Sequence, residues 1–274
     1  MGGSCLAERL AHYVALTAQE KNALASLEEQ ERSFKRGATV RREHDSAREL
    51  FIVQKGWLHS CVLLGNGSRQ IMRFHFPGDV VGLSSLALGK SSDSITAVTD
   101  VTLCPFDKDK LALLFNEHPR LAALIFTLSI AERVSLADRL ASIGRTSARE
   151  RVASLLCEVF ARLRIVEGAK LDEYLVPLTQ EEIGDATGLT AVHVNRMMRG
   201  LVDDGLICRN GSTISGVDER RLAEEANFVD RHQHVAAGER GVAAHRHFRS
   251  RREPAQLVIG LAARIGDGEG GLAE

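Results

Sequence analysis

The chain has 274 residues, of which 44% are hydrophobic and 26% are charged. These fractions are typical of globular proteins and exclude a wholly disordered chain, and the length fits one large domain or two ordinary ones. The 35 Lys and Arg residues nearly balance the 36 Asp and Glu residues, which leaves a formal net charge of −1. The overall charge therefore points neither to nucleic acid nor to an anionic membrane, and any DNA-binding surface must be basic locally.

The cysteine pattern and the hydropathy favour a cytoplasmic protein. The five cysteines are widely spaced and form no CxxC pair: Cys5, Cys61, Cys104, Cys157 and Cys208. This spacing favours reduced thiols over a zinc site or a disulfide framework. The longest apolar stretch, residues 121–131, is about half of the ~20 residues that span a membrane, and no basic-then-apolar leader is visible. We expect no membrane association and no bound cofactor.

A predicted helix opens the chain, and a β-rich segment follows it. Apolar residues recur about once per turn over residues 6–31. Between residues 33 and 107, turn signals separate short β-rich runs at residues 50–53, 57–64, 70–76, 95–98 and 101–104. Asn66–Gly67 predicts a type I′ hairpin turn, because both central positions of that turn need positive φ. Many short strands at this spacing favour a sandwich or a barrel.

Helices return from residue 108. A short amphipathic piece ends near Pro119, and residues 120–143 then contain no Gly or Pro. This stretch carries one apolar stripe that begins at Leu121 and a second, adjacent stripe of Leu136, Leu140 and Ile143. Such a helix either packs on its own domain and a partner at once or is an ordinary core helix, and its periodicity does not distinguish the two. Residues 144–146 predict a hinge, with a further helix over residues 147–163.

Residues 177–214 carry the sharpest pattern. Thr179 followed by Glu182 is a capping box, which predicts a helix start, and Gly188 ends that helix. Thr190 caps a second helix, whose expected buried face is Val194, Met197, Met198 and Leu201. Two short helices joined by a glycine-containing turn form a helix-turn-helix. Residues 205–214 read as a β-hairpin wing with its turn at Asn210–Gly211.

The outward face of the second predicted helix provides candidate DNA contacts. Arg196 can donate two hydrogen bonds to a guanine edge. Asn195 and His193 can reach base edges or phosphates, and the Val192 methyl groups can contact a thymine methyl. The residues placed for phosphate contacts are Thr179, Gln180, Thr190 and Arg199. A helix-turn-helix pattern also occurs as a plain helical hairpin, but the wing favours DNA.

Three stretches, residues 50–57, 76–82 and 178–207, resemble the Crp/Fnr family of bacterial transcription regulators. The resemblance covers roughly residues 10–225. It implies an α+β fold with a cyclic-nucleotide-binding-type β jelly roll and an N-terminal helix (1–119), a dimerisation helix (120–143) and a C-terminal winged helix-turn-helix (147–226). It also implies a homodimer on a pseudo-palindromic double-stranded DNA operator, with half-sites about one DNA turn apart. A contact with RNA polymerase stays open.

The resemblance places an effector pocket at Gly82, Leu83, Ser84, Ser85, Asp93 and Ser94. Family members that bind cyclic AMP carry a Glu that holds the ribose and an Arg that holds the cyclic phosphate. Here the Glu is absent, and Asp93 stands about where the Arg would be. We therefore expect an effector other than cyclic AMP.

Other effectors of the family also fit poorly. Only Cys5 lies near the start, too few thiols for an iron–sulfur cluster. The histidines of the β-rich half, His44, His59 and His75, are expected to be surface or strand residues and not haem ligands. Cys61 or Cys104 could sense oxidants, although a buried structural thiol is favoured. Control by abundance alone stays open.

The second predicted helix departs from the family at one position. Many members carry a Glu at the position of Val192, which reads a cytosine amino group. A valine cannot accept that hydrogen bond. We expect the guanine contact of Arg196 to persist while the preference for the neighbouring base differs.

Residues 227–274 are expected to be a disordered extension without a family counterpart. Their Arg/His cluster at residues 240–252 could touch phosphates or a metal, and an altered reading frame near residue 227 would give the same composition. For the whole chain, the alternative function is a ligand-binding regulatory module that acts through protein partners. An enzyme is not expected, because no catalytic triad, metal motif or P-loop is visible.

Overall fold

The computed structural model of the protein describes residues 3–167 and 171–233. The expectations for residues 234–274, including the Arg/His cluster, concern residues outside this range. Residues 227–233, which were predicted to begin the disordered extension, lie within the described residues and make specific contacts.

The N-terminal segment forms two short helices instead of the single helix predicted over residues 6–31. They are α1 (Cys5–Ala11) and α2 (Ala18–Ala25), and a 3-10 turn, η1 (Ser26–Glu28), follows. The chain breaks because Thr17 caps α2: its hydroxyl accepts the Glu20 N–H, and the Glu20 carboxylate accepts the Thr17 N–H at 2.8 Å. A capping box starts a new helix, which leucine spacing alone does not reveal.

The β-rich segment folds into two antiparallel four-stranded sheets. One has the order β1-β8-β3-β6, from β1 (Arg32–Phe34), β8 (Val101–Asp107), β3 (Glu49–Lys55) and β6 (Val80–Val81). The other has the order β2-β7-β4-β5, from β2 (Thr39–Arg41), β7 (Ser94–Ala97), β4 (Leu58–Leu63) and β5 (Arg69–His75). All five predicted β-rich runs contribute residues to strands, and the jelly-roll expectation is confirmed.

Strand β3 is buried on both faces because it lies between two layers. Phe51 and Val53 join the core between the sheets, together with Leu58 and Leu103. Leu50 and Ile52 alternate with them and pack instead against the helices α1, α4 (Lys108–Glu117) and α5 (Pro119–Arg145). The strand's continuous apolar run reflects these two cores, since side chains alternate across a strand.

The Asn66–Gly67 turn differs from its predicted type, and the wing turn lies one residue beyond its predicted position. At the β4–β5 turn only Gly67 has positive φ, its N–H donates to the Leu64 carbonyl at 2.8 Å, and the Asn66 side chain accepts the Ser68 N–H. The type I′ prediction is therefore wrong, and the geometry is that of a type I turn closed by a glycine. In the wing the loop is Gly211–Ser212, because Asn210 pairs with Thr213 in the ladder.

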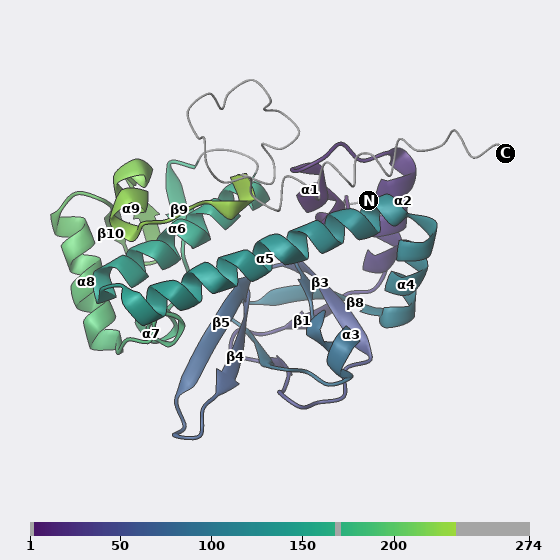
Figure 1. The fold of residues 1–274 in the computed structure, drawn as a ribbon, viewed down its shortest axis with the longest axis horizontal. Helices are drawn as coiled ribbons and strands as arrows, with labels where there is room; N and C mark the ends of the chain where they lie inside the picture. The colour runs from purple at the N-terminus through teal and green to yellow at the C-terminus, as the bar shows by residue number, and fades with distance from the viewer. Residues whose placement is uncertain (1–2, 168–170, 234–274) are drawn as a thin grey trace.

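Helix α5 crosses the molecule from the N-terminal helices to the C-terminal domain (Figure 1). It begins with Pro119 at its first turn, where a missing N–H costs nothing. The helix includes Gly144 and ends at Arg145, so the break before the next helix lies at residues 146–147. The predicted hinge, residues 144–146, overlaps this break only at residue 146. One face, including Leu121 and Leu128, is buried, whereas Phe126, Leu136 and Leu140 are exposed.

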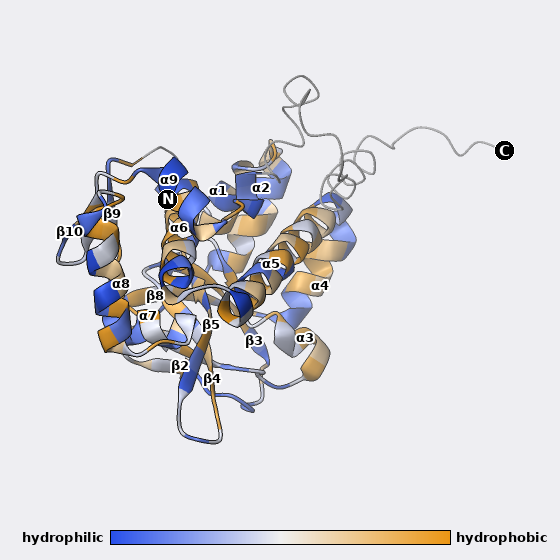
Figure 2. Ribbon diagram, turned by 60° about the vertical axis from the view of Figure 1, so that its left-hand side comes forward, coloured by the Kyte–Doolittle hydropathy of each residue, from blue (hydrophilic) through white to orange (hydrophobic). Residues whose placement is uncertain are grey.

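The C-terminal domain begins with α6 (Ala148–Glu167) and contains a helix pair and a small sheet. Its further elements are β9 (Glu173–Leu175), α7 (Gln180–Thr187), α8 (Ala191–Asp203), β10 (Cys208–Asn210), β11 (Thr213–Ser215) and α9 (Glu219–Ala226). The sheet has the order β10-β11-β9. Figure 2 shows hydrophobic and hydrophilic residues along α8, as expected for a helix with one buried face.

The N-terminal and C-terminal domains share one apolar core. Trp57, Ile71 and Phe76 of the β sandwich belong to the same buried cluster as Leu156 and Phe160 of α6. Helix α7 also packs on β5, where Arg69 and Asp185 form an ion pair at 2.6 Å. The two domains are therefore docked on each other along a seam lined by α6 and α7.

Candidate nucleic-acid interface

Helix α7 begins and ends as the sequence predicts. The Thr179 hydroxyl accepts the Glu182 N–H at 3.1 Å, and the Glu182 carboxylate accepts the Thr179 N–H at 2.7 Å. Gly188 ends the helix in the left-handed region with φ +70°. Gly184 permits the close approach of the following turn, since an added Cβ would lie 2.4 Å from the Leu189 carbonyl oxygen. These local features set the angle at which α8 leaves the turn.

Helix α8 buries one face and presents the other. Val194, Met198 and Leu201 are buried, and Met197 packs partly against the same core. On the opposite face Val192 is 79% exposed. Ala191, His193, Arg196 and Arg199 are exposed as well, and Asn195 is half-buried. The structure therefore gathers the predicted base-reading side chains on one accessible helix face.

The charge on this face is uncompensated. Among the described residues, neither Arg196 nor Arg199 has a hydrogen-bond or ion-pair partner. On the wing, Arg209 is exposed and its Nε donates to the Gly211 carbonyl at 3.0 Å. Asp204, just beyond the end of α8, is paired instead with Arg149 at 2.6 Å. A locally basic surface thus exists on a chain whose net charge is near zero.

The residues predicted to contact phosphates lie at helix starts and on the helix flank. Thr179 and Thr190 are the N-caps of α7 and α8, and Gln180 is the first residue of α7. The Thr190 hydroxyl lies 3.0 Å from Nδ1 of His193, which orients the imidazole at the start of α8. Helix N-termini favour anions through their free N–H groups.

The predicted effector residues are only partly brought together. Gly82, Leu83, Ser84 and Asp93 line a cavity of about 360 Å³ between the β sandwich and the helices α5 and α6. Ser85 and Ser94 do not line it: the Ser85 hydroxyl donates to the Gly82 carbonyl, and the Ser94 hydroxyl oxygen accepts the Glu43 N–H. Helix α3 (Ser84–Leu88) begins at the edge of this cavity, and we call the segment of residues 82–85 the cradle.

The charged residues of the cavity lining bear on the expected effector. Residues 82–85 carry no carboxylate for a ribose, and the Asp93 carboxylate on the cavity wall would repel a phosphate. Of the arginines that line the cavity, Arg73, Arg139 and Arg162 each pair with an acid, and Arg133 is exposed. An effector other than cyclic AMP therefore stays a prediction.

The candidate sensor side chains of the β-rich half are mostly buried. Burial, reinforced by Arg69, lowers the pKa of His59 to about 4, and burial with Arg73 lowers that of His75 to about 3. His44 is exposed. Burial raises the pKa of Cys104 to about 12 and also raises that of Cys61, so both thiols stay protonated at neutral pH.

Within the described residues, no group of three or more His, Cys, Asp or Glu side chains could hold a metal ion. In the same part of the chain, no helix is both long and apolar enough to cross a membrane.

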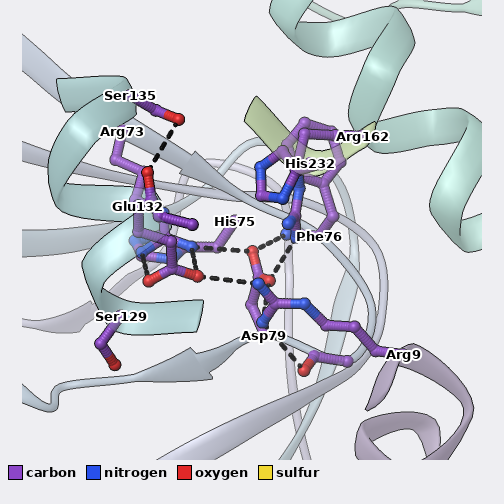
Figure 3. A network of polar contacts seen from close by, with 12 residues as sticks. Arg9, Arg73, His75, Phe76, Asp79, Ser129, Glu132, Ser135, Arg162 and His232 are labelled. Carbon is purple, nitrogen blue, oxygen red and sulfur yellow. Dashed lines mark hydrogen bonds and ion pairs between the residues drawn. The ribbon is translucent and has the colours of Figure 1, made fainter. Parts of the chain in front are cut away.

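A cluster of charged residues beneath α5 was not predicted from the sequence. Arg9 of α1 pairs with Asp79 at 2.6 Å and with Glu132 of α5 at 2.7 Å. Arg73 of β5 binds Glu132 through two contacts of 2.6 Å, and Arg162 of α6 binds Asp79 (Figure 3). We call these five residues the buried ionic cluster. Only Asp79 of this cluster lies in a recognisable local pattern, the Pro-Gly-Asp turn at residues 77–79. Its carboxylate accepts the Phe76 N–H at 3.0 Å.

The buried ionic cluster keeps its acids charged. Burial raises the pKa of both carboxyls, but the guanidinium groups outweigh it. The pKa of Glu132 falls to about 2, and Arg162 and Arg9 hold that of Asp79 well below its usual range. The cluster therefore stays ionised at neutral pH and joins both domains to α5.

Comparisons with known proteins match both domains. The chain matches the family model of the cyclic nucleotide-binding domain over residues 31–118 and that of the Crp-like helix-turn-helix domain over residues 150–225. It is 33% identical over 189 residues to the nitrogen fixation regulation protein FixK of Bradyrhizobium diazoefficiens, which covers 69% of this chain and 78% of that protein.

Two further relatives extend the match. The chain is 25% identical over 209 residues to the transcriptional activator protein anr of Pseudomonas aeruginosa, over 76% of this chain and 85% of that protein. The solved structure of FixK2 from Bradyrhizobium japonicum is similar with a TM-score of 0.64 at 29% identity, over 71% of this chain and 96% of that chain.

Proposed function

The chain belongs to the Crp/Fnr family of bacterial transcription regulators, and from this premise we propose that it binds a pseudo-palindromic operator as a homodimer. Membership makes it a DNA-binding transcription regulator and not an enzyme. In this proposal residues 1–119 form the sensor domain, residues 120–143 of α5 form the dimerisation helix, and residues 147–226 form the DNA-binding domain. The protein acts in the cytoplasm, and a contact with RNA polymerase would follow DNA binding.

The exposed face of α8 carries the proposal. Arg196 and Arg199 are exposed and lack protein partners in the described residues, so no internal ion pair has to break before they meet DNA. We assign the guanine contact to Arg196, base-edge contacts to Asn195 and His193, and a thymine methyl contact to Val192. The phosphate contacts fall to Arg199, Thr179, Gln180 and Thr190.

The exposed apolar side chains of α5 support the homodimer. Phe126 is 58% and Leu140 is 72% exposed, and Leu136 lies between them on the same helix. Burying such side chains in a second copy would remove their apolar surface from water. Two copies joined along α5 would present two recognition helices to successive major grooves, about one DNA turn apart.

The effector is proposed to be a ligand or signal other than cyclic AMP. Two features support this proposal: residues 82–85 carry no carboxylate for a ribose, and the Asp93 carboxylate lines the cavity, where it would repel a phosphate. A repositioning of the DNA-binding domain by the sensor domain would pass through α5 and α6, because both helices line that cavity.

The test of the DNA-reading role is Arg196→Ala. Fluorescence anisotropy would compare the full-length variant with the wild type on an operator selected from random DNA and on a scrambled duplex. The variant should lose about 1–3 kcal/mol, about 5- to 150-fold in affinity, on the operator and lose discrimination at one base pair per half-site.

The matched control is Arg36→Ala, which removes the same charge from an exposed position in the β1–β2 turn. It should retain operator affinity and discrimination. Unchanged discrimination in Arg196→Ala would overturn its assigned role. Equal binding of the wild type to operator and scrambled DNA would favour the alternative function through protein partners.

A further inference from the structure

The chain turns back after α9 and runs along the domain seam. Asn227 ends α9 in the left-handed region with φ +47°, and the Phe228 N–H donates to the Ala223 carbonyl at 2.9 Å. Such a cap reverses the direction of the chain. Phe228 then packs against the core of the C-terminal domain. We call residues 228–233 the C-terminal strap.

The strap joins α6 to α5 through two charged residues. Asp230 pairs with Arg164 of α6 at 3.2 Å. Arg231 binds Asp138 of α5 through two hydrogen bonds, Nε to Oδ2 at 2.7 Å and Nη2 to Oδ1 at 3.2 Å. A guanidinium that holds a carboxylate at two points fixes orientation as well as distance.

The strap also reaches the N-terminal domain through His232. Its Nδ1 lies 3.0 Å from the Tyr13 hydroxyl, and the two side chains are only 8% and 6% exposed. Figure 3 places His232 beside Arg162, close to the buried ionic cluster. Burial, together with Arg162 and Arg9, lowers the pKa of His232, so a neutral imidazole fills this position without adding charge.

We propose that the C-terminal strap latches the DNA-binding domain to the sensor domain and thereby preorganises the recognition helix for its operator. The contacts of the strap with Arg164 of α6, Asp138 of α5 and Tyr13 all lie outside α8. The strap therefore sets orientation and not base preference. A docked domain has less freedom to lose on binding, which raises affinity. The affinity effect rests on the proposed DNA-binding function.

The only tryptophan of the chain allows the latch to be tested without DNA. Trp57 is 8% exposed and stacks edge-on against Phe76 at 4.6 Å, and the Arg162 guanidinium covers the Phe76 ring at 5.5 Å. Trp57 thus belongs to the core that the two domains share. Acrylamide quenching of its fluorescence reports opening of the seam.

The variants for this measurement are Arg231→Gln, Asp138→Asn and Tyr13→Phe in the full-length protein. Each should raise the quenching constant of Trp57 about twofold, because each removes one attachment of the strap. Tyr13→Phe removes only the hydroxyl that His232 contacts, away from α5. The control is Arg220→Gln, whose side chain is 81% exposed in a surface pair with Glu224 and which should quench like the wild type.

The same variants are then titrated with the selected operator and a scrambled duplex. Operator affinity should fall about threefold to tenfold while the operator-to-scrambled ratio stays constant. The charge exchange Asp138→Arg with Arg231→Asp should restore both affinity and quenching. Wild-type quenching in Arg231→Gln and Tyr13→Phe, or operator affinity equal to or above the wild type, would overturn the latch. Failure of the wild type to discriminate operators would instead overturn the DNA-binding proposal, since quenching is measured without DNA.

Discussion

Arg162 of α6 and Asp79 of the β5–β6 turn form an ion pair whose side chains are 5% and 0% exposed. The pair crosses from the C-terminal to the N-terminal domain, so its loss affects the docking of both. Asp79→Asn should lower the free energy of unfolding by about 3–5 kcal/mol, because Arg162 and Arg9 would remain buried with less compensating charge. Urea denaturation followed by Trp57 fluorescence measures this loss.

The control for that substitution is Glu29→Gln, which breaks the exposed pair with Lys110 at 3.3 Å. It should cost at most about 1 kcal/mol. Equal losses in Asp79→Asn and Glu29→Gln would contradict the importance of the buried ionic cluster.

Replacing Gly184 with any residue that carries a Cβ should destabilise the protein. An added Cβ would meet the Leu189 carbonyl oxygen at 2.4 Å, and backbone cannot move away as a flexible side chain can. Gly184→Ala should therefore destabilise the protein by about 1–3 kcal/mol, as overpacking does. Gly144→Ala is the matched control: its Cβ would meet nothing within 4 Å, and alanine should stabilise the helix by up to about 1 kcal/mol. Thermal unfolding measures the change in Tm of both variants. A change in the same direction for both would contradict the prediction.

Stability should begin to fall below about pH 6.5. His59 and His75 are neutral when folded, with pKa values of about 4 and about 3, whereas the unfolded residues titrate at 6.5. Below pH 6.5 the unfolded state binds protons that the native state does not, so acid favours unfolding and the stability is fully present above pH 6.5. The slope approaches about 1.4 kcal/mol per pH unit for each histidine. Glu132, with its pKa of about 2, adds a further loss below about pH 4.5.

The variant that tests this pH dependence is His59→Gln, measured by urea denaturation from pH 7.5 to 5. It should reduce the slope by about one proton. A wild-type slope in His59→Gln would show that the buried imidazole does not cause the pH dependence.

Substitutions of Arg199 and Arg196 should affect DNA binding differently: one should change the salt dependence of affinity and the other the base discrimination. Arg199 is assigned to a phosphate, so Arg199→Ala should weaken binding to all sequences and reduce the slope of log K against log salt by about 1. Arg196→Ala should change discrimination instead. Titrations at several salt concentrations on operator and scrambled DNA measure both effects. Loss of discrimination in Arg199→Ala would reverse the two assignments.

The sequence predicted correctly those helix ends that a single capping side chain or glycine determines. Thr179 with Glu182 and Thr190 set the helix starts, and Gly188 set the turn, as observed. Thr17 and Glu20 form a capping box of the same kind. The prediction followed the leucine spacing instead, so it gave one helix and missed the break before α2. At Asn66 the side-chain contact to the Ser68 N–H selected a turn that the Asn-Gly pair alone does not specify.

Long-range pairings could not be predicted from a single sequence. Arg9, Asp79, Glu132 and Arg162 meet only because four segments pack together, and nothing in their spacing selects these charges from the 35 basic and 36 acidic residues. The strap was missed for the same reason. The composition of residues 227–233 suggested an extension, whereas the contacts of Arg231 and His232 depend on α5 and Tyr13.

Sequence-specific binding through α8 is tested most directly by a binding selection with the full-length wild-type protein on random double-stranded DNA. We expect an inverted repeat with half-sites about 10 base pairs apart, centre to centre. Each half-site should contain one invariant guanine that Arg196→Ala no longer selects, next to a base that differs from the common family preference because Val192 cannot accept a hydrogen bond. Recovery of the ordinary family half-site unchanged would contradict the assignment of Val192. Absence of an enriched inverted repeat would contradict sequence-specific binding by a homodimer through α8.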